Sequence, residues 1–126
     1  MNNLLLVAIG GSIGASSRYL FYLLFKNYLF PNYLFISTLI VNILGSFFIG
    51  YIIMLMETKS LSQDFIRYFL IVGILGSFTT FSTFSFETIE LMSNKKFLIA
   101  FFYMFLSLSI CLLFTFVGLN FNKFIH

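Results

Sequence analysis

Residues 73–85 read GILGSFTTFSTFS and lie inside an apolar segment that runs from about residue 65 to residue 92. Two glycines, followed by five hydroxyl residues within seven positions, weaken a helix here. As one straight helix, the segment would extend ~42 Å, whereas the hydrocarbon core of a bilayer is ~30 Å thick. We therefore predict a non-helical break near Gly76 to Thr80. The alternative is an unbroken, tilted helix whose Ser and Thr side chains bond back to the backbone.

A break at membrane depth is tolerated only where it is buried in protein or lines a polar cavity. Its freed carbonyl groups can hold a cation, as in transporters with discontinuous helices. Phe81 and Phe84 follow three residues apart, so they point to one side, and the positive edges of two aromatic rings can meet an anion. In a chain with 20 Phe, the alternative is that both rings face lipid or the protein core.

The rest of the chain continues this apolar pattern. Four long apolar segments cover about residues 4–25, 33–56, 65–92 and 97–121. Each exceeds the roughly 20 residues that a transmembrane helix needs. The apolar runs are continuous rather than alternating, which excludes a transmembrane β-barrel. We predict an all-α, multi-pass protein of the cell (inner or plasma) membrane, with four transmembrane helices forming one domain over residues 1–126.

The composition supports this class. Hydrophobic residues make up 60% of the chain and charged residues 9%, against roughly 25% charged residues in a typical soluble domain. A soluble protein of this size needs a polar surface that seven Lys and Arg plus four Asp and Glu cannot supply. The basic residues are scattered, mostly at the ends of apolar runs, whereas a nucleic-acid-binding protein would cluster them on one face.

The basic residues outside the first segment are divided evenly between the two sides of the membrane. Each side has three: Lys59, Arg67 and Lys123 on the side of the N-terminus, and Lys26, Lys95 and Lys96 on the other. Lys and Arg normally concentrate on the cytoplasmic side, so a chain without this bias can insert both ways and pair as an antiparallel dimer. The alternative is that so few charges fail to show a real bias.

Two stripes of polar residues follow helical spacing. The second segment has Thr38, Asn42 and Ser46, and the fourth has Tyr103, Ser107, Cys111 and Thr115. Residues four apart share one helix face, and each polar group needs a partner away from lipid. The stripes indicate either a polar pathway or hydrogen bonds between helices. In the first segment, Gly10-x-x-x-Gly14 indicates close helix packing.

The charged residues set limits on function. Glu87 and Glu90 lie near the end of the third segment, and we interpret them as interfacial charges, which leaves no mid-membrane carboxylate to relay protons. The sequence has no metal-ligand spacing and no nucleophile–base pair, so we predict that the protein is not an enzyme. Arg18 lies within the first segment, where it either snorkels to the interface or attracts anions from a watery vestibule.

Three stretches together resemble the CrcB-type fluoride channels, the Fluc family. They are GSIGASSRY at residues 11–19, TLIVNILGSF at residues 38–47, and residues 73–84. The resemblance covers the whole chain. It implies a passive, fluoride-selective channel that exports cytoplasmic fluoride from a microbial cell and so relieves its toxicity. It also implies an antiparallel, dual-topology homodimer.

The resemblance also implies site residues. A structural Na⁺ at the dimer centre would be held by the backbone carbonyls of Gly76 and Thr79. The implied pore residues are Arg18, Asn42, Phe81, Phe84, Tyr103 and Ser107. We add, as possible donors to an anion on the same route, Thr38, Ser82 and Thr83. Two positions depart from the family pattern. Ser77 stands where a second glycine is frequent, and Cys111, a weaker donor, stands where a serine is frequent.

Two other functions are compatible with a small four-helix membrane protein. The first is a dual-topology multidrug exporter, which requires a membrane-embedded carboxylate, typically in its first helix; this chain has no acidic residue before Glu57. The second is a non-transporting subunit that only assembles with partner proteins.

Overall fold

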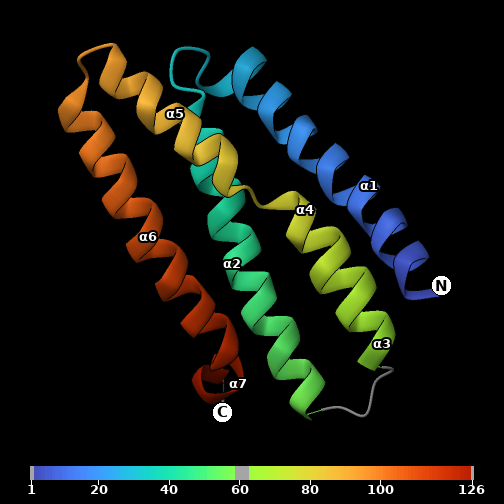
Figure 1. Ribbon diagram of the computed structural model, residues 1–126. Coiled ribbons are helices and arrows are strands. Elements are labelled where there is room, and N and C mark those ends of the chain that lie inside the picture. Colours follow the sequence, from blue (N-terminus) through green and yellow to red (C-terminus); the bar gives the residue numbers. More distant parts are fainter. Residues whose placement is uncertain (1, 59–62, 126) are drawn as a thin grey trace.

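The computed structural model describes residues 2–58 and 63–125 (Figure 1). Within these residues, four helical segments are long and apolar enough to cross a membrane: Asn2–Leu29, Phe35–Thr58, Gln63–Ser93 and Phe97–Leu119. The prediction of an all-α protein with four such segments is confirmed. Lys59, which entered the count of charges on each side, and most of the join between the second and third segments lie outside the described residues.

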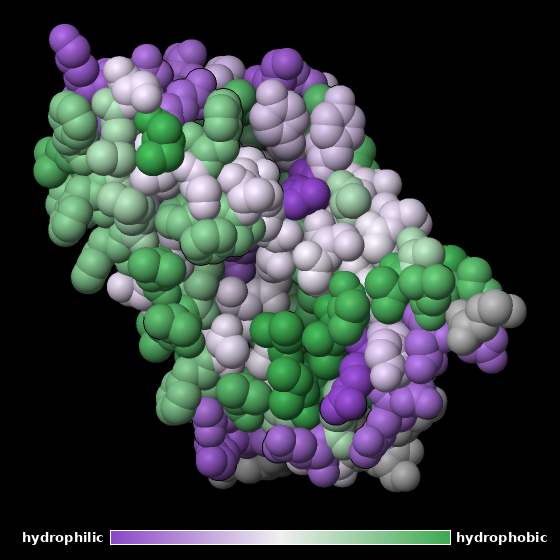
Figure 2. All heavy atoms as spheres, in the orientation of Figure 1, coloured by the Kyte–Doolittle hydropathy of each residue, from purple (hydrophilic) through white to green (hydrophobic). Residues whose placement is uncertain are grey.

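Each segment consists of one or more helical elements. The elements are α1 (Asn2–Leu24), η1 (Phe25–Leu29), α2 (Phe35–Thr58), α3 (Gln63–Phe65), η2 (Ile66–Leu75), α4 (Gly76–Phe78), α5 (Phe81–Ser93), α6 (Phe97–Leu119) and α7 (Phe121–Ile125). The two η elements are wider, π-helical continuations of the first and third segments. Figure 2 shows hydrophilic residues gathered at the two ends of the molecule and hydrophobic residues along the flanks between them, as a bilayer requires.

A tight turn joins α5 to α6. The backbone of Lys95 is left-handed, with φ 60°. The Lys96 N–H donates to the Leu91 carbonyl at 2.9 Å, and the Lys95 N–H donates to the Met92 carbonyl at 3.0 Å. This pair of bonds is a Schellman motif, which satisfies the last carbonyls of α5. The turn makes α5 and α6 antiparallel neighbours (Figure 1).

Glycines permit the closest helix contacts. A Cβ on Gly14 would collide with the carbonyl of Ile74, so α1 and η2 meet backbone to backbone. Gly50 of α2 and Gly118 of α6 meet in the same way, because a Cβ on either would collide with a carbonyl of the other helix. The packing of α1 through its Gly-x-x-x-Gly spacing agrees with the sequence interpretation.

The third segment changes both conformation and neighbours at Thr79 and Thr80. Thr79 has φ −76° and ψ 158°, and Thr80 has φ −151° and ψ 123°, so both are extended. Gly76 to Phe78 remain helical. Before this junction, η2 and α4 pack mainly on α1; after it, α5 packs mainly on α6 and α2 (Figure 1).

Candidate functional site

The extended backbone at Thr79 and Thr80 is held by side chains of two other helices. Asn42, in α2, donates from Nδ2 to the Thr80 carbonyl at 2.9 Å and accepts at Oδ1 from the Thr80 N–H at 2.8 Å. Arg18, in α1, places Nη1 at 3.4 Å from the Thr79 carbonyl oxygen. Backbone groups at membrane depth must be paired within the protein, and Asn42 does this for Thr80 in place of a helical neighbour.

Hydroxyl groups order the start of α5. Thr80 Oγ1 accepts from the Thr83 N–H at 3.2 Å and donates to Thr83 Oγ1 at 3.0 Å. Its distance to Ser82 Oγ is 3.4 Å. Thr80 is therefore the N-cap of α5, and the hydroxyls of Ser82 and Thr83 lie around it on an exposed part of the chain.

A cavity of about 510 Å³ lies beside the junction. Its lining includes Asn42, Gly45, Ser46, Gly76, Thr79, Thr80, Phe81, Phe84, Ser107 and Cys111. No Lys, Arg, Asp or Glu lines this cavity among the residues that the structure describes. The structure thus brings Gly76 and Thr79 to the same cavity as six residues predicted from the polar stripes and the Phe pair.

Ser107 has the least satisfied side chain in this cavity. It is 6% exposed, and within residues 2–58 and 63–125 its Oγ has no hydrogen-bond partner. A buried hydroxyl without a partner is unfavourable by about 1–3 kcal/mol. A small polar ligand or water in the cavity would remove this cost, so the geometry indicates a site for a small hydrogen-bonding ligand.

The Glu87 carboxylate forms a second polar cluster with two hydroxyl groups, and this cluster was not predicted from the sequence. Glu87, in α5, accepts at Oε1 from Thr38 Oγ1 of α2 at 2.8 Å and at Oε2 from the Tyr103 hydroxyl of α6 at 2.7 Å. Thr38 and Tyr103 are buried, and Glu87 is half-buried. Glu87 is therefore not a free charge, because one hydroxyl from each polar stripe donates to its carboxylate.

A sequence signal for Glu87 does exist. Thr80, Thr83 and Glu87 are spaced three and four residues apart, which places them on one face of α5. This face continues the polar track that begins with the hydroxyl residues of the junction. Thr80 was also missed as a site residue, although it is the partner of Asn42.

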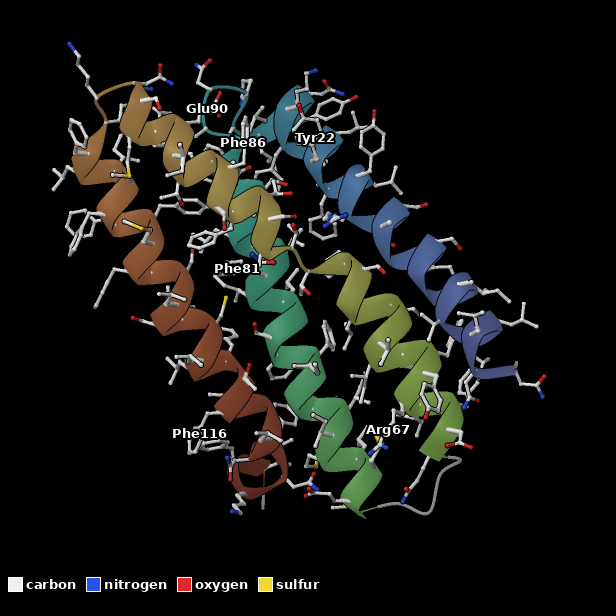
Figure 3. All side chains as sticks on the ribbon, in the orientation of Figure 1. Tyr22, Arg67, Phe81, Phe86, Glu90 and Phe116 are labelled. Atoms are coloured by element: carbon white, nitrogen blue, oxygen red, sulfur yellow. The ribbon has the colours of Figure 1, made fainter. Side chains whose placement is uncertain are left out.

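A second cavity, of about 440 Å³, begins at Glu87 and lies toward the end of the molecule that holds the α5–α6 turn. Its lining includes Tyr22, Asn32, Thr83, Phe86, Glu87, Glu90, Asn94 and Lys96. Figure 3 shows Tyr22, Phe86 and Glu90 together at this end. Charged and polar residues make this cavity more hydrophilic than the one beside the junction.

Phe84 and Tyr103 connect the two cavities. The Phe84 ring lines the larger cavity, and its centroid is 5.2 Å from that of Tyr103 in an edge-to-face arrangement. The Tyr103 hydroxyl, in turn, binds Glu87 in the wall of the second cavity. Both rings are buried, and they lie between the larger cavity and the Glu87 carboxylate of the second.

The two phenylalanines predicted as a pair are in contact but differ in exposure. The Phe81 and Phe84 centroids are 5.4 Å apart. Phe84 is 8% exposed, whereas Phe81 is 72% exposed and lies at the α4–α5 junction (Figure 3). Helical spacing predicted the contact between the rings, but it could not show that only one of them is covered by the chain's own helices.

The sequence is similar to a known protein family over almost its full length. The family described as "CrcB-like protein, Camphor Resistance (CrcB)" matches residues 5–119. Two similar proteins from Shewanella pealeana and Shewanella oneidensis are each named "Fluoride-specific ion channel FluC". The Shewanella pealeana protein is 44% identical to this chain, over 98% of this chain and 100% of its own length. The Shewanella oneidensis protein is 47% identical, over 94% of this chain and 94% of its own length. A protein of the same name from Campylobacter hominis is 38% identical over 98% of this chain and 97% of its own length.

Proposed function

The chain belongs to the CrcB-like protein family, and from this membership we propose that it is a passive, fluoride-selective channel that exports cytoplasmic fluoride across the cell membrane. The observation that carries the proposal is the buried Ser107 hydroxyl beside Asn42 and Phe84, which among the described residues has no hydrogen-bond partner and shares its cavity with no charged side chain. We propose that this site conducts an ion and that the protein is not an enzyme.

A fluoride ion that loses its water needs hydrogen-bond donors along its route. In the larger cavity, Ser107 supplies a hydroxyl and Asn42 has one amide hydrogen beyond the one given to Thr80. The rings of Phe81 and Phe84 line the same space, and an aromatic ring has a positive edge that can meet an anion. Because no fixed charge lines this cavity among the described residues, fluoride would bind weakly enough to leave again.

Beyond the larger cavity, fluoride would reach hydroxyl groups that already donate to a carboxylate. The hydroxyls of Thr38 and Tyr103 donate to Glu87. Fluoride reaching this point would exchange places with a carboxylate oxygen as the acceptor of one of these hydroxyls. The second cavity, with Lys96 and Asn94 in its lining, then leads to the aqueous phase.

We propose further that the channel is an antiparallel, dual-topology homodimer. Phe81 and the first-turn hydroxyls of Ser82 and Thr83 are exposed on the single chain. Hydroxyl groups at membrane depth are better placed against protein than against lipid tails, and a second copy would cover them together with Phe81. The even division of basic residues between the two sides of the membrane supports the antiparallel arrangement.

A structural Na⁺ at the dimer centre is part of the same proposal, as is a functional break in the third transmembrane helix. Hard cations take oxygen ligands, and among the described residues no group of His, Cys, Asp and Glu could hold a metal ion. The extended backbone at Thr79 and the position of Gly76 beside it support carbonyl ligation. One chain offers two carbonyls, and a second copy would double the set. A bound cation would add positive potential beside the route.

Flux from liposomes tests the proposed function. Purified protein reconstituted into fluoride-loaded liposomes should release fluoride, measured with a fluoride electrode, and should not release chloride. Transport of a lipophilic cation driven by a proton gradient would instead support the multidrug exporter. A protein that transports neither would support the assembly subunit and would contradict the channel.

Purification without sodium tests the central ion. We expect protein prepared in N-methyl-D-glucamine buffer to lose fluoride flux and dimer content, measured by size-exclusion chromatography with light scattering, and to regain both when Na⁺ returns. Protein that keeps full flux and dimer content without sodium would contradict the Na⁺ assignment.

A further inference from the structure

Cys111 of α6 adds a chemically distinct group to the wall of the larger cavity. It is a free thiol of intermediate exposure, and it follows Ser107 by four residues on the same helix face. Both side chains line the cavity, together with Ser46 of α2, whose side chain lies beside the Cys111 thiol. The unpaired, buried Ser107 hydroxyl independently indicates that this space takes a small ligand.

We propose that Cys111 is a covalent modification site for small, uncharged, thiol-reactive electrophiles, and that its adduct occupies the part of the larger cavity beside the Ser107 hydroxyl. The volume of about 510 Å³ leaves ample room for a group of two or three heavy atoms. Apolar residues such as Leu108 and Leu112 complete the wall around the thiol, which favours uncharged reagents over charged ones.

Methyl methanethiosulfonate is a suitable probe. The Cys111 sulfur, having given its proton to water, attacks the methylthio sulfur of the reagent. A new sulfur–sulfur bond forms, and the bond between the reagent's two sulfurs breaks. Methanesulfinate leaves with the bonding electron pair. The product carries one methylthio group on Cys111, and dithiothreitol reverses the reaction by thiol–disulfide exchange.

Mass spectrometry of the intact protein in liposomes reads out the adduct without any assumption about transport. We expect one methylthio group on the wild-type chain and none on Cys111→Ser. Ser46→Leu, which places a larger side chain beside the thiol, should slow labelling. The matched control is the double variant Cys111→Ser with Leu113→Cys, which moves the thiol to the lipid-facing side of α6. Leu113 is 55% exposed and lies outside the lining of the cavity.

Flux supplies the second readout, and here the inference rests on the proposed function. Labelled wild-type protein should lose most of its fluoride flux and recover it with dithiothreitol, whereas the Leu113→Cys control should be labelled without losing flux. A wild-type protein without flux before labelling would contradict the channel, while the labelling rates would still test the site.

Three results would overturn the inference. The first is a wild-type chain that is labelled only after unfolding in detergent. The second is Ser46→Leu labelling as fast as the wild type. The third is full labelling with unchanged flux in a protein that conducts.

Discussion

The side-chain amide of Asn42 forms two hydrogen bonds with the backbone of a single residue, Thr80, at 2.9 Å and 2.8 Å. It is the link that connects α2 to the extended junction between α4 and α5. The same amide lies in the wall of the larger cavity. Asn42 therefore couples the shape of the third segment to the space through which we propose that fluoride passes.

Replacing Asn42 with leucine should destabilise the protein and stop flux. The Thr80 N–H and carbonyl would both lose their partner, at about 1–3 kcal/mol for each buried group. Thermal unfolding in detergent measures the first effect and liposome efflux the second. Ser12→Ala is the control, because within the described part of the chain the exposed Ser12 hydroxyl bonds only to the carbonyl of Ile9 in its own helix. A stable, conducting Asn42→Leu protein would show that this pair does not hold the junction.

Phe81→Ile should abolish fluoride flux while leaving the dimer intact. Phe81 is 72% exposed, so its truncation removes little packing within the chain, and isoleucine keeps an apolar side chain where the second copy would cover it, but the change removes an aromatic ring from the cavity. The matched control is Phe116→Ile: Phe116 is 58% exposed and points away from the bundle on α6 (Figure 3). Efflux and light scattering check both variants. Equal flux in Phe81→Ile and Phe116→Ile would contradict the role of Phe81 in the pore.

Tyr103→Phe should reduce flux without unfolding the protein. The ring would keep its edge-to-face contact with Phe84, but Glu87 would lose a hydrogen bond of the charged class, which is worth about 1.5–3 kcal/mol. Tyr28→Phe is the control, since Tyr28 is largely exposed in η1 and lines neither cavity. Efflux rates that match in the two variants would remove Tyr103 and Glu87 from the proposed route.

Gly14→Ala should destabilise the bundle by separating α1 from the third segment. Its new Cβ would collide with the Ile74 carbonyl, which is backbone and cannot rotate away, and overpacking of this kind costs about 1–3 kcal/mol. Gly76→Ala is the comparison, because a Cβ there meets only the Ile71 carbonyl, at an ordinary 3.5 Å. We expect thermal unfolding in detergent to separate the two variants. A Gly14→Ala protein as stable as Gly76→Ala would mean that α1 can shift without loss.

The sequence by itself determined the membrane class and the four segments. A backbone in lipid has to satisfy its own hydrogen bonds, so a long apolar run is a helix whatever its neighbours are. Local spacing was also sufficient for Gly10 and Gly14, which meet the backbone of the third segment, and for the contact between Phe81 and Phe84. These features depend only on residues close together in the chain.

Only the tertiary structure decided which polar groups meet. Glu87 was interpreted as an interfacial charge from its position near the end of the third segment, whereas its partners, Thr38 and Tyr103, lie 49 and 16 residues away on other helices. The pairing of Asn42 with Thr80 is likewise separated by 38 residues. Such pairs depend on how each helix is rotated about its axis, and that rotation is set by packing between helices, which spacing within one helix does not encode.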